Sequence, residues 1–171
     1  YGGGKARHLA GDVRDPAHLE AAVAKAVEAF GGLDITIANA GQSGRVDLGD
    51  GDLGRAEAII GTNLIGAYYT FNAAVPKMKA PGRLIATSSV LGKFGVPGYA
   101  AYCASKAGIL GLVRATAHEV AKKGITCNAI VPGWVDTKMS DIGLEEIAAA
   151  TGRSRDEVKK DAVAAFPLGR F

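Results

Sequence analysis

The apolar residues of this 171-residue chain recur with two periods that alternate along the sequence, which predicts alternating helices and strands. Between residues 15 and 32 they recur every three or four positions, as on one face of a helix. Asp15 followed by Pro16 is typical of a helix start, and Gly31 with Gly32 is typical of a helix end. The pattern therefore predicts an amphipathic helix between these two signals.

Short apolar runs bounded by turn residues predict four strands. The predicted strands are Arg7 to Val13, Leu33 to Ala38, Arg83 to Thr87 and Ile125 to Val131. A polar, glycine-rich loop follows the second of them, from Gln42 to Asp52. Further helical patterns cover about Leu53 to Lys79, the segment around Tyr102 that Gly124 ends, Leu144–Ala150 and Asp156–Phe166.

Strands that alternate with amphipathic helices predict an α/β fold with a doubly wound, Rossmann-like parallel sheet that helices cover on both faces. We expect residues 1–171 to form one such domain, incomplete at both ends. In such sheets ligands bind beyond the carboxyl ends of the strands. The residues that follow the predicted strands are Asp12 and Val13, Asn39 to Gly41, Ser88 and Ser89, and Pro132 to Thr137. We therefore expect these residues to meet at one edge of the sheet, beside the helix that carries Tyr102.

Composition narrows the class of protein. Hydrophobic residues make up 48% and charged residues 22%, and the net charge of +3 has no basic cluster, so we expect no nucleic-acid partner. No apolar run approaches the roughly 20 residues that span a bilayer, and no secretory signal opens the chain, so we expect a cytoplasmic protein without membrane contact. Cys103 and Cys127 lie in apolar segments and suit buried free thiols. His8, His18 and His118 have no partners at ligand spacing, so we expect no metal site.

The most informative pair is Tyr102 and Lys106, which lie one helical turn apart in an alanine-rich segment. An ammonium group beside a phenol favours the phenolate, so we expect Lys106 to lower the pKa of Tyr102 and make it a general acid and base. Tyr1 and Lys5 have the same spacing, but Gly2, Gly3 and Gly4 between them disfavour a helix. Only the first pair is therefore a candidate site.

Several short motifs occur together in one order along the chain. They are Asp12-Val13, Asn39-Ala40-Gly41, Asn63 with Gly66, Ser89, Tyr102-x-x-x-Lys106, and Asn128 followed by Pro132-Gly133 and Thr137. Together these motifs resemble those of the classical short-chain dehydrogenase/reductase family, over nearly all of the chain to about residue 140. The resemblance implies an NAD(P)-dependent oxidoreductase that interconverts a secondary alcohol and a ketone, often as a homotetramer.

The resemblance also implies roles for single residues. Tyr102 would be the general acid in reduction and the general base in oxidation, with its pKa lowered by Lys106. Lys106 would also hydrogen-bond the nicotinamide ribose, and Asn63 would anchor a water of the proton relay. Ser89 would orient the substrate oxygen, and it is chosen over Ser88 because it precedes Tyr102 by thirteen residues.

The residues implied to contact NAD or NADP are Asp12, Val13, Asn39, Ala40, Gly41, Tyr102, Lys106, Pro132, Gly133, Val135 and Thr137. The glycine-rich strand–turn–helix that holds the pyrophosphate in this family does not occur in the sequence, and Gly2 to Gly4 do not replace it. The sequence therefore reads as an internal piece of a longer protein, and the choice between NAD and NADP stays open.

Each motif alone also has a plain structural interpretation: Asn39 to Gly41 as a turn, Asn63 as a helix bend, Ser89 as a turn serine. Two other functions therefore remain: a nicotinamide-dependent epimerase or dehydratase of the same fold, and a non-catalytic binding protein.

The substrate is a small molecule, and a 3-oxoacyl thioester and a small hydroxy compound are not distinguished. Candidate pocket residues are Val90, Leu91, Phe94, Pro97, Trp134 and Met139; the helices expected to join subunits cover about Gly66–Lys79 and Tyr99–Lys122.

Overall fold

The computed structural model describes residues 4–49 and 52–171. The expectation for the Tyr1 and Lys5 pair, and two residues of the predicted loop from Gln42 to Asp52, lie outside the described residues. None of the described helices has the length and hydropathy that a membrane-spanning segment requires.

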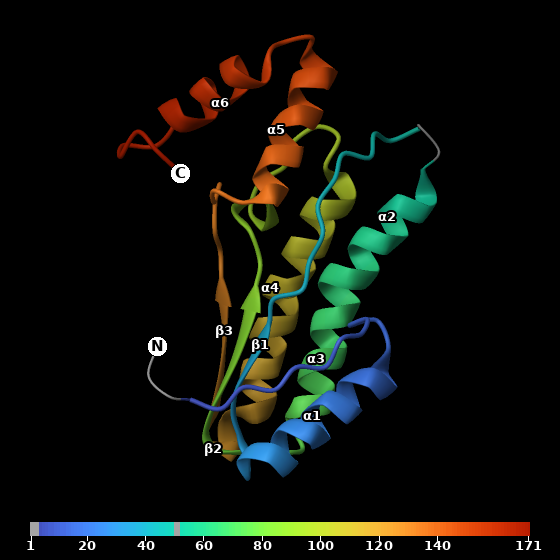
Figure 1. Cartoon of the computed structure of the whole chain (residues 1–171), viewed down its shortest axis with the longest axis vertical. Helices are drawn as coiled ribbons and strands as arrows, with labels where there is room; N and C mark the ends of the chain where they lie inside the picture. Colours follow the sequence, from blue (N-terminus) through green and yellow to red (C-terminus); the bar gives the residue numbers. More distant parts are fainter. Residues whose placement is uncertain (1–3, 50–51) are drawn as a thin grey trace.

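The described strands form one parallel sheet in the order β1-β2-β3 (Figure 1). The strands are β1 (Leu33–Ala38), β2 (Met78–Thr87) and β3 (Ile125–Ile130). Ala38 pairs with Ala86, and Ala86 pairs with Ala129, so the three carboxyl ends lie level. The prediction of a Rossmann-like α/β fold is confirmed, as are three of the four predicted strands.

Helices connect the strands. They are α1 (Pro16–Phe30), α2 (Leu53–Ile60), the π-helical turn η1 (Gly61–Ile65), α3 (Gly66–Ala74), the 3-10 turn η2 (Val90–Gly92), α4 (Ala100–Val120) with its 3-10 extension η3 (Ala121–Lys123), α5 (Lys138–Thr151) and α6 (Arg155–Ala164). The predicted caps are confirmed: the side chain of Asp15 accepts a hydrogen bond from the N–H of Ala17, and Gly31 and Gly124 end their helices with φ of 79° and 68°.

Two predicted segments differ from the structure. Arg7 to Val13 forms no strand and runs as a loop into α1 (Figure 1). A strand needs a hydrogen-bonded neighbour, and the three described strands pair only with one another. The helix predicted to reach Lys79 ends at Ala74, and β2 begins at Met78 because that residue pairs with Leu33.

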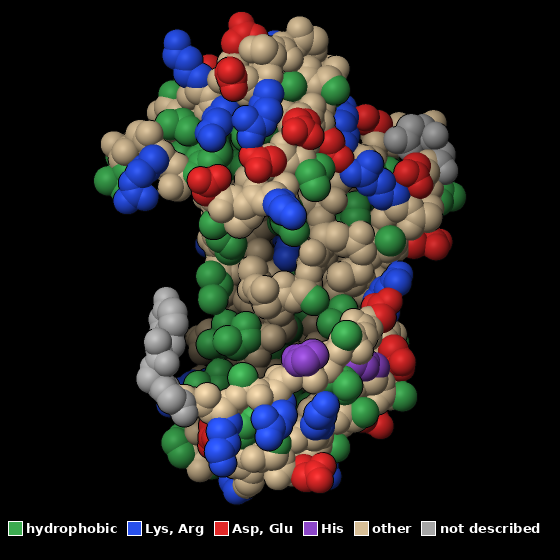
Figure 2. All heavy atoms as spheres, in the orientation of Figure 1, with side chains coloured by type: hydrophobic (Ala, Val, Ile, Leu, Met, Phe, Trp, Pro, Cys, Tyr) green, Lys and Arg blue, Asp and Glu red, His purple; other side chains and the backbone are tan. Residues whose placement is uncertain are grey.

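One face of the sheet carries the main hydrophobic core. Leu84 and Ala86 of β2 are fully buried there against Phe71 of α3 and Ile109 of α4, while α1 packs on α3 and on β1. On the opposite face Ile35, Ile37 and Ile130 are 57%, 55% and 53% exposed, and Figure 2 shows hydrophobic side chains gathered over the strands. Helices were expected on both faces; the described residues place them over one.

Helices α5 and α6 form a cap beyond the carboxyl ends of the strands (Figure 1). The cap has a small core of its own, in which Leu144 and Ala148 of α5 pack with Val158 of α6. Phe171 stacks on Trp134 with ring centroids 5.6 Å apart and joins the same cluster. The cap therefore provides a second wall opposite the strand ends, which is where the candidate site lies.

Candidate active site

Helix α4 is fixed to the end of β2 by a direct contact. The hydroxyl of Ser88 is buried and donates a hydrogen bond of 2.7 Å to the backbone oxygen of Lys106. Gly92 makes the approach possible, because a Cβ there would lie 2.8 Å from the same oxygen. Ser88 thus holds the helix, while the next residue, Ser89, lines a pocket together with Tyr102.

The side chain of Lys106 points toward the carboxyl end of the sheet. Its Nζ donates a hydrogen bond of 2.8 Å to the backbone oxygen of Thr87, and it lies 5.6 Å from the centroid of the Tyr102 ring. Lys106 is 5% exposed, and burial lowers its pKa from 10.5 to about 8. The ammonium group is therefore held in a poorly hydrated position beside the phenol.

The expected lowering of the Tyr102 pKa by Lys106 is not found. The pKa of Tyr102 is raised above its ordinary value, chiefly because the phenol is buried; a hydrogen bond with Ser89 opposes this shift, and the neighbouring Cys103 adds to it. The Lys106 ammonium is turned to the Thr87 carbonyl, so burial dominates. Tyr102 is consequently a phenol that keeps its proton at neutral pH, and it lines the same pocket as Ser89.

Asn63 lies in the π-helical turn and is 1% exposed. Its Nδ2 donates to the backbone oxygen of Gln42 at 3.0 Å and to Oγ of Ser105 at 2.9 Å. Its Oδ1 accepts from the backbone N–H of Gln42 at 2.8 Å. Asn63 therefore ties the segment after β1 to helix α4, one residue before Lys106. Gln42 and Ser105 were not predicted, since neither stands in a motif and the contacts span 21 and 42 residues.

The segment Asn39 to Gly41 lies at the same strand ends. Oδ1 of Asn39 accepts a hydrogen bond of 2.9 Å from the hydroxyl of Thr87, which joins the ends of β1 and β2. A Cβ on Gly41 would lie 3.2 Å from Oδ1 of Asn63 and 3.5 Å from Nζ of Lys106. The Asn63 amide and the Lys106 ammonium thus face one space beside Gly41. Ala40, which stands between Asn39 and Gly41 in the chain, is exposed.

The remaining predicted residues have separate positions. The backbone oxygen of Pro132 accepts from the N–H of Val90 at 3.0 Å, and Gly133 lines the pocket. Val135 is exposed, and Thr137 caps the start of α5.

Asp12 and Val13 make their contacts elsewhere. The Asp12 carboxylate is paired with Arg14 at 2.6 Å, and that partner lowers its pKa to about 2. Val13 packs on α3, where a Cβ on Gly66 would lie 2.6 Å from its Cγ2. The structure therefore brings Asn39 to Gly41, Asn63, Ser89, Tyr102 and Lys106 together. Asp12 contacts Arg14 and Val13 packs against Gly66, and their expected contact with the cofactor stays a prediction.

The pocket has a volume of about 500 Å³ and is lined by residues of the cap and of the segments that follow β2 and β3. Of the predicted pocket residues, Val90, Leu91, Phe94, Trp134 and Met139 line it, and Pro97 does not. The sequence did not predict the other lining residues, which are Ser43, Val96, Tyr99, Ser140, Gly143, Ile147, Ala162, Ala165 and Phe166.

A carboxylate from the cap joins three other elements near this pocket. Oε2 of Glu146 accepts hydrogen bonds from the hydroxyl of Tyr99 at 3.1 Å and from the backbone N–H of Arg45 at 3.0 Å, and Oε1 is paired with Arg55. Burial, and then Glu146, raises the pKa of Tyr99 to about 12. No sequence motif marks Glu146, because its partners lie up to 101 residues away.

Comparison with known proteins gives a consistent assignment. Residues 2–170 match the family described as enoyl-(acyl carrier protein) reductase. A 3-oxoacyl-[acyl-carrier-protein] reductase of Staphylococcus aureus is 35% identical over 162 residues, which cover 94% of this chain and 61% of that protein. A D-beta-hydroxybutyrate dehydrogenase of Cupriavidus necator is 36% identical over 163 residues, covering 94% and 63%.

The fold has a matching solved structure, that of an NAD+-bound xylitol dehydrogenase, with a TM-score of 0.87 and 27% sequence identity. The match covers 94% of this chain and 65% of that one. The chain thus spans less than two thirds of the length of these relatives. From the family match, the identities and the arrangement of Ser89, Tyr102 and Lys106, the chain belongs to the short-chain dehydrogenase/reductase family.

Proposed function

We propose that the protein interconverts a secondary alcohol and a ketone, with NAD or NADP as the hydride carrier. The observation that carries the proposal is that Ser89 and Tyr102 line one apolar pocket, with the Lys106 ammonium 5.6 Å from the centroid of the Tyr102 ring. The named activities of the relatives, which include 3-oxoacyl reduction and hydroxybutyrate oxidation, support this class of reaction.

The residues at the strand ends fit a nicotinamide cofactor. The space beside Gly41 would be narrowed by a Cβ, and the Asn63 amide and the Lys106 ammonium face it. An ammonium has three N–H donors, and within the described residues the hydrogen bond to Thr87 uses one of them. When bound, the cofactor gives or accepts the hydride. Lys106 would hold its ribose hydroxyls, and Asn39 to Gly41, Pro132, Gly133, Val135 and Thr137 would lie along it.

In the reducing direction Tyr102 would donate its proton to the ketone oxygen. Its raised pKa keeps the phenol protonated at neutral pH, so the donor is present when the substrate binds. Ser89 would donate a hydrogen bond to the same oxygen and orient the carbonyl toward the phenol. Asn63 would hold Gln42 and Ser105 in place, and its Oδ1 would anchor a water that passes protons toward Lys106.

The test is the Tyr102→Phe variant of the protein, assayed for NADH and NADPH oxidation against a panel of ketones. We expect kcat to fall by roughly 10²–10⁴-fold, with an unchanged unfolding midpoint, because a positioned proton donor is lost. Tyr69→Phe, on α3 and outside the pocket lining, is the matched control and should leave kcat unchanged. Full activity of Tyr102→Phe would contradict the proposal and favour a binding protein; epimerisation or dehydration without net nucleotide turnover would favour the other enzyme class.

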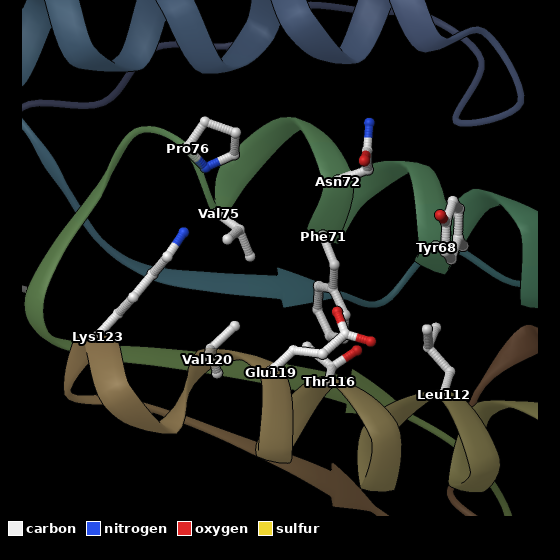
Figure 3. Close-up of a pocket in the computed structure, with 10 residues that line it drawn as sticks. All are labelled: Tyr68, Phe71, Asn72, Val75, Pro76, Leu112, Thr116, Glu119, Val120 and Lys123. Atoms are coloured by element: carbon white, nitrogen blue, oxygen red, sulfur yellow. The ribbon is translucent and has the colours of Figure 1, made fainter.

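We also propose that the protein is a homo-oligomer, a tetramer by analogy with its family, that uses helices α3 and α4. A hollow of about 260 Å³ lies between them, lined by Tyr68 and Phe71 of α3 and by Leu112 and Thr116 of α4 (Figure 3). Tyr68 is 52% exposed beside this hollow. Tyr68→Lys should reduce the molar mass measured by light scattering; an unchanged mass would exclude this face.

We also propose a cytoplasmic location, which the free thiols of Cys103 and Cys127 suit.

A further inference from the structure

The pocket beside Tyr102 has an unusual chemical composition. Five of the eleven aromatic side chains of the sequence line it, together with several aliphatic side chains. The five are Phe94, Tyr99, Tyr102, Trp134 and Phe166. No lysine, arginine, histidine, aspartate or glutamate is among its lining residues within the described part of the chain. The walls thus favour apolar groups and provide no charge to pair with an ionic one.

Lys106, the cation beside Tyr102, donates to Thr87 and is assigned to the cofactor in the proposed function. The other charged groups that meet this wall at Tyr99 are already paired. Glu146 binds Tyr99 and Arg55, and the guanidinium of Arg45 binds Asp47 with Nε at 2.8 Å. A carboxylate that entered the pocket would lose its water without gaining a cation. An anionic substrate is therefore disfavoured by the pocket itself.

The hydroxyl groups of the pocket are also largely occupied. Tyr99 donates to Glu146, and the hydroxyl of Ser140 donates to the backbone oxygen of Val135. Ser89 and Tyr102 are reserved for the reacting oxygen, which leaves Ser43 as the remaining side-chain hydroxyl of the described lining. A polyol would bring several hydroxyl groups into a pocket whose described lining offers one remaining side-chain hydroxyl, and unpaired buried hydroxyls weaken binding.

We infer that the substrate is an uncharged ketone or secondary alcohol whose larger substituent is an alkyl or aryl group that lies between the cap and η2. The inference rests on the proposed function and narrows its substrate class. It separates this chain from relatives named for hydroxybutyrate, an anion, and xylitol, a polyol. Trp134 and Phe166 on the side of the cap, and Leu91 and Phe94 in and after η2, are among the side chains that would contact the substituent.

The first experiment compares ketones of equal length with either nucleotide. The neutral 2-octanone and its ω-carboxylate analogue 7-oxooctanoate differ at the far end, and methyl 7-oxooctanoate restores neutrality at similar size. We expect kcat/KM for 2-octanone and the ester to exceed that for the acid by on the order of 100-fold. Along the series from 2-butanone to 2-octanone, each methylene should lower KM about fourfold, since burial of apolar area drives binding.

A variant tests the missing cation directly. Leu91→Lys places an ammonium in the wall and should raise kcat/KM for 7-oxooctanoate at least tenfold while lowering it for 2-octanone. Ala149→Lys adds the same charge on the exposed side of α5 and should change neither value. Equal use of acid and neutral ketone by the unmodified protein, or no gain in Leu91→Lys, would overturn the inference.

Binding is measured separately from turnover through Trp134, the single tryptophan of the sequence, which lines the pocket. We expect the Kd of 2-octanone, measured from the change in Trp134 fluorescence, to be at least tenfold lower than the Kd of 7-oxooctanoate. Trp134→Phe should abolish the signal. Selective binding without reduction of any ketone would defeat the proposed function and leave the substrate preference standing. Reduction of acid and ketone alike, with equal binding, would defeat the preference alone.

Discussion

The phenol of Tyr99 donates a hydrogen bond of 3.1 Å to Glu146, which lies 47 residues later in the chain and on the cap. The same carboxylate accepts from the backbone of Arg45 and is paired with Arg55 of α2. One side chain therefore joins α5 to the start of α4, to the loop after β1 and to α2. Because Tyr99 also lines the pocket, this junction ties the cap to the start of helix α4.

Glu146→Gln should loosen this junction. The change removes the charge that pairs with Arg55, and we expect the free energy of unfolding to fall by about 1–3 kcal/mol in urea titrations. The pKa of Tyr99 should move down from about 12, since Glu146 contributes to its shift, although burial remains. Spectrophotometric titration of the tyrosines measures this second effect.

Glu145→Gln is the matched control, because its side chain is exposed one residue earlier on α5. It should change neither the unfolding free energy nor the tyrosine titration. Identical behaviour of the two variants would show that the Glu146 junction does not stabilise the cap.

Lys106→Met should make the protein more stable and inactive. Burial lowers the pKa of Lys106 from 10.5 to about 8, so the folded state resists protonation of this side chain. At pH 7, the penalty of keeping the buried ammonium charged lowers the free energy of unfolding by up to roughly 3 kcal/mol. An uncharged side chain of similar length avoids it, while losing the group proposed to hold the cofactor. Urea unfolding and the ketone assay measure the two effects, and Lys93→Met, at an exposed position, is the control.

The pH dependence of the unfolding free energy provides a second test of the Lys106 prediction. Between about pH 8 and 10.5 the unfolded chain keeps the Lys106 proton and the folded protein has released it, so the penalty is fully present below pH 8 and disappears as pH rises through this window. The stability difference between Lys106→Met and the unmodified protein should therefore shrink from pH 8 to 10.5. A difference that stays constant across this range would contradict the buried, shifted ammonium.

Local patterns predicted the elements that carry the site. The helix from Asp15, the strand Leu33–Ala38 and the helix that Gly124 ends were all recognised, because caps, glycines and apolar spacing act within a few residues. The thirteen-residue spacing also selected Ser89 over Ser88, and the structure places Ser89 in the pocket and Ser88 against α4.

Features that depend on distant partners were not predictable in this way. The segment from Arg7 to Val13 has strand-like residues but no described strand to pair with. The pKa of Tyr102 depends on how deeply the phenol is buried and where the Lys106 ammonium points, and a four-residue spacing determines neither. The Glu146 junction joins residues up to 101 positions apart, for which the sequence holds no local signal.

The two adjacent serines should separate stability from catalysis. Ser88→Ala removes a buried hydrogen bond of 2.7 Å to Lys106, and we expect a loss of about 1–2 kcal/mol in unfolding free energy with a modest change in kcat. Ser89→Ala should lower kcat on the order of 100-fold, because it removes the hydroxyl proposed to orient the ketone. Its stability loss should be about 1 kcal/mol, since the hydroxyl also accepts a hydrogen bond of 3.2 Å from the N–H of Leu91 at the start of η2. Each variant serves as control for the other, and the opposite pattern would reassign the substrate contact to Ser88.

Gly92→Ala should disturb the same contact from the backbone side. A Cβ at Gly92 would lie 2.8 Å from the backbone oxygen and 2.9 Å from the backbone carbon of Lys106, so α4 or η2 must shift to admit it. We expect a loss of about 1–3 kcal/mol in unfolding free energy, the range for overpacked sites, together with reduced kcat because Lys106 and Tyr102 move with the helix. Gly95→Ala is the matched control, since a Cβ there meets nothing within 4 Å and should leave both values nearly unchanged. If Gly92→Ala folds and reacts as Gly95→Ala does, the close contact between η2 and α4 does not position helix α4.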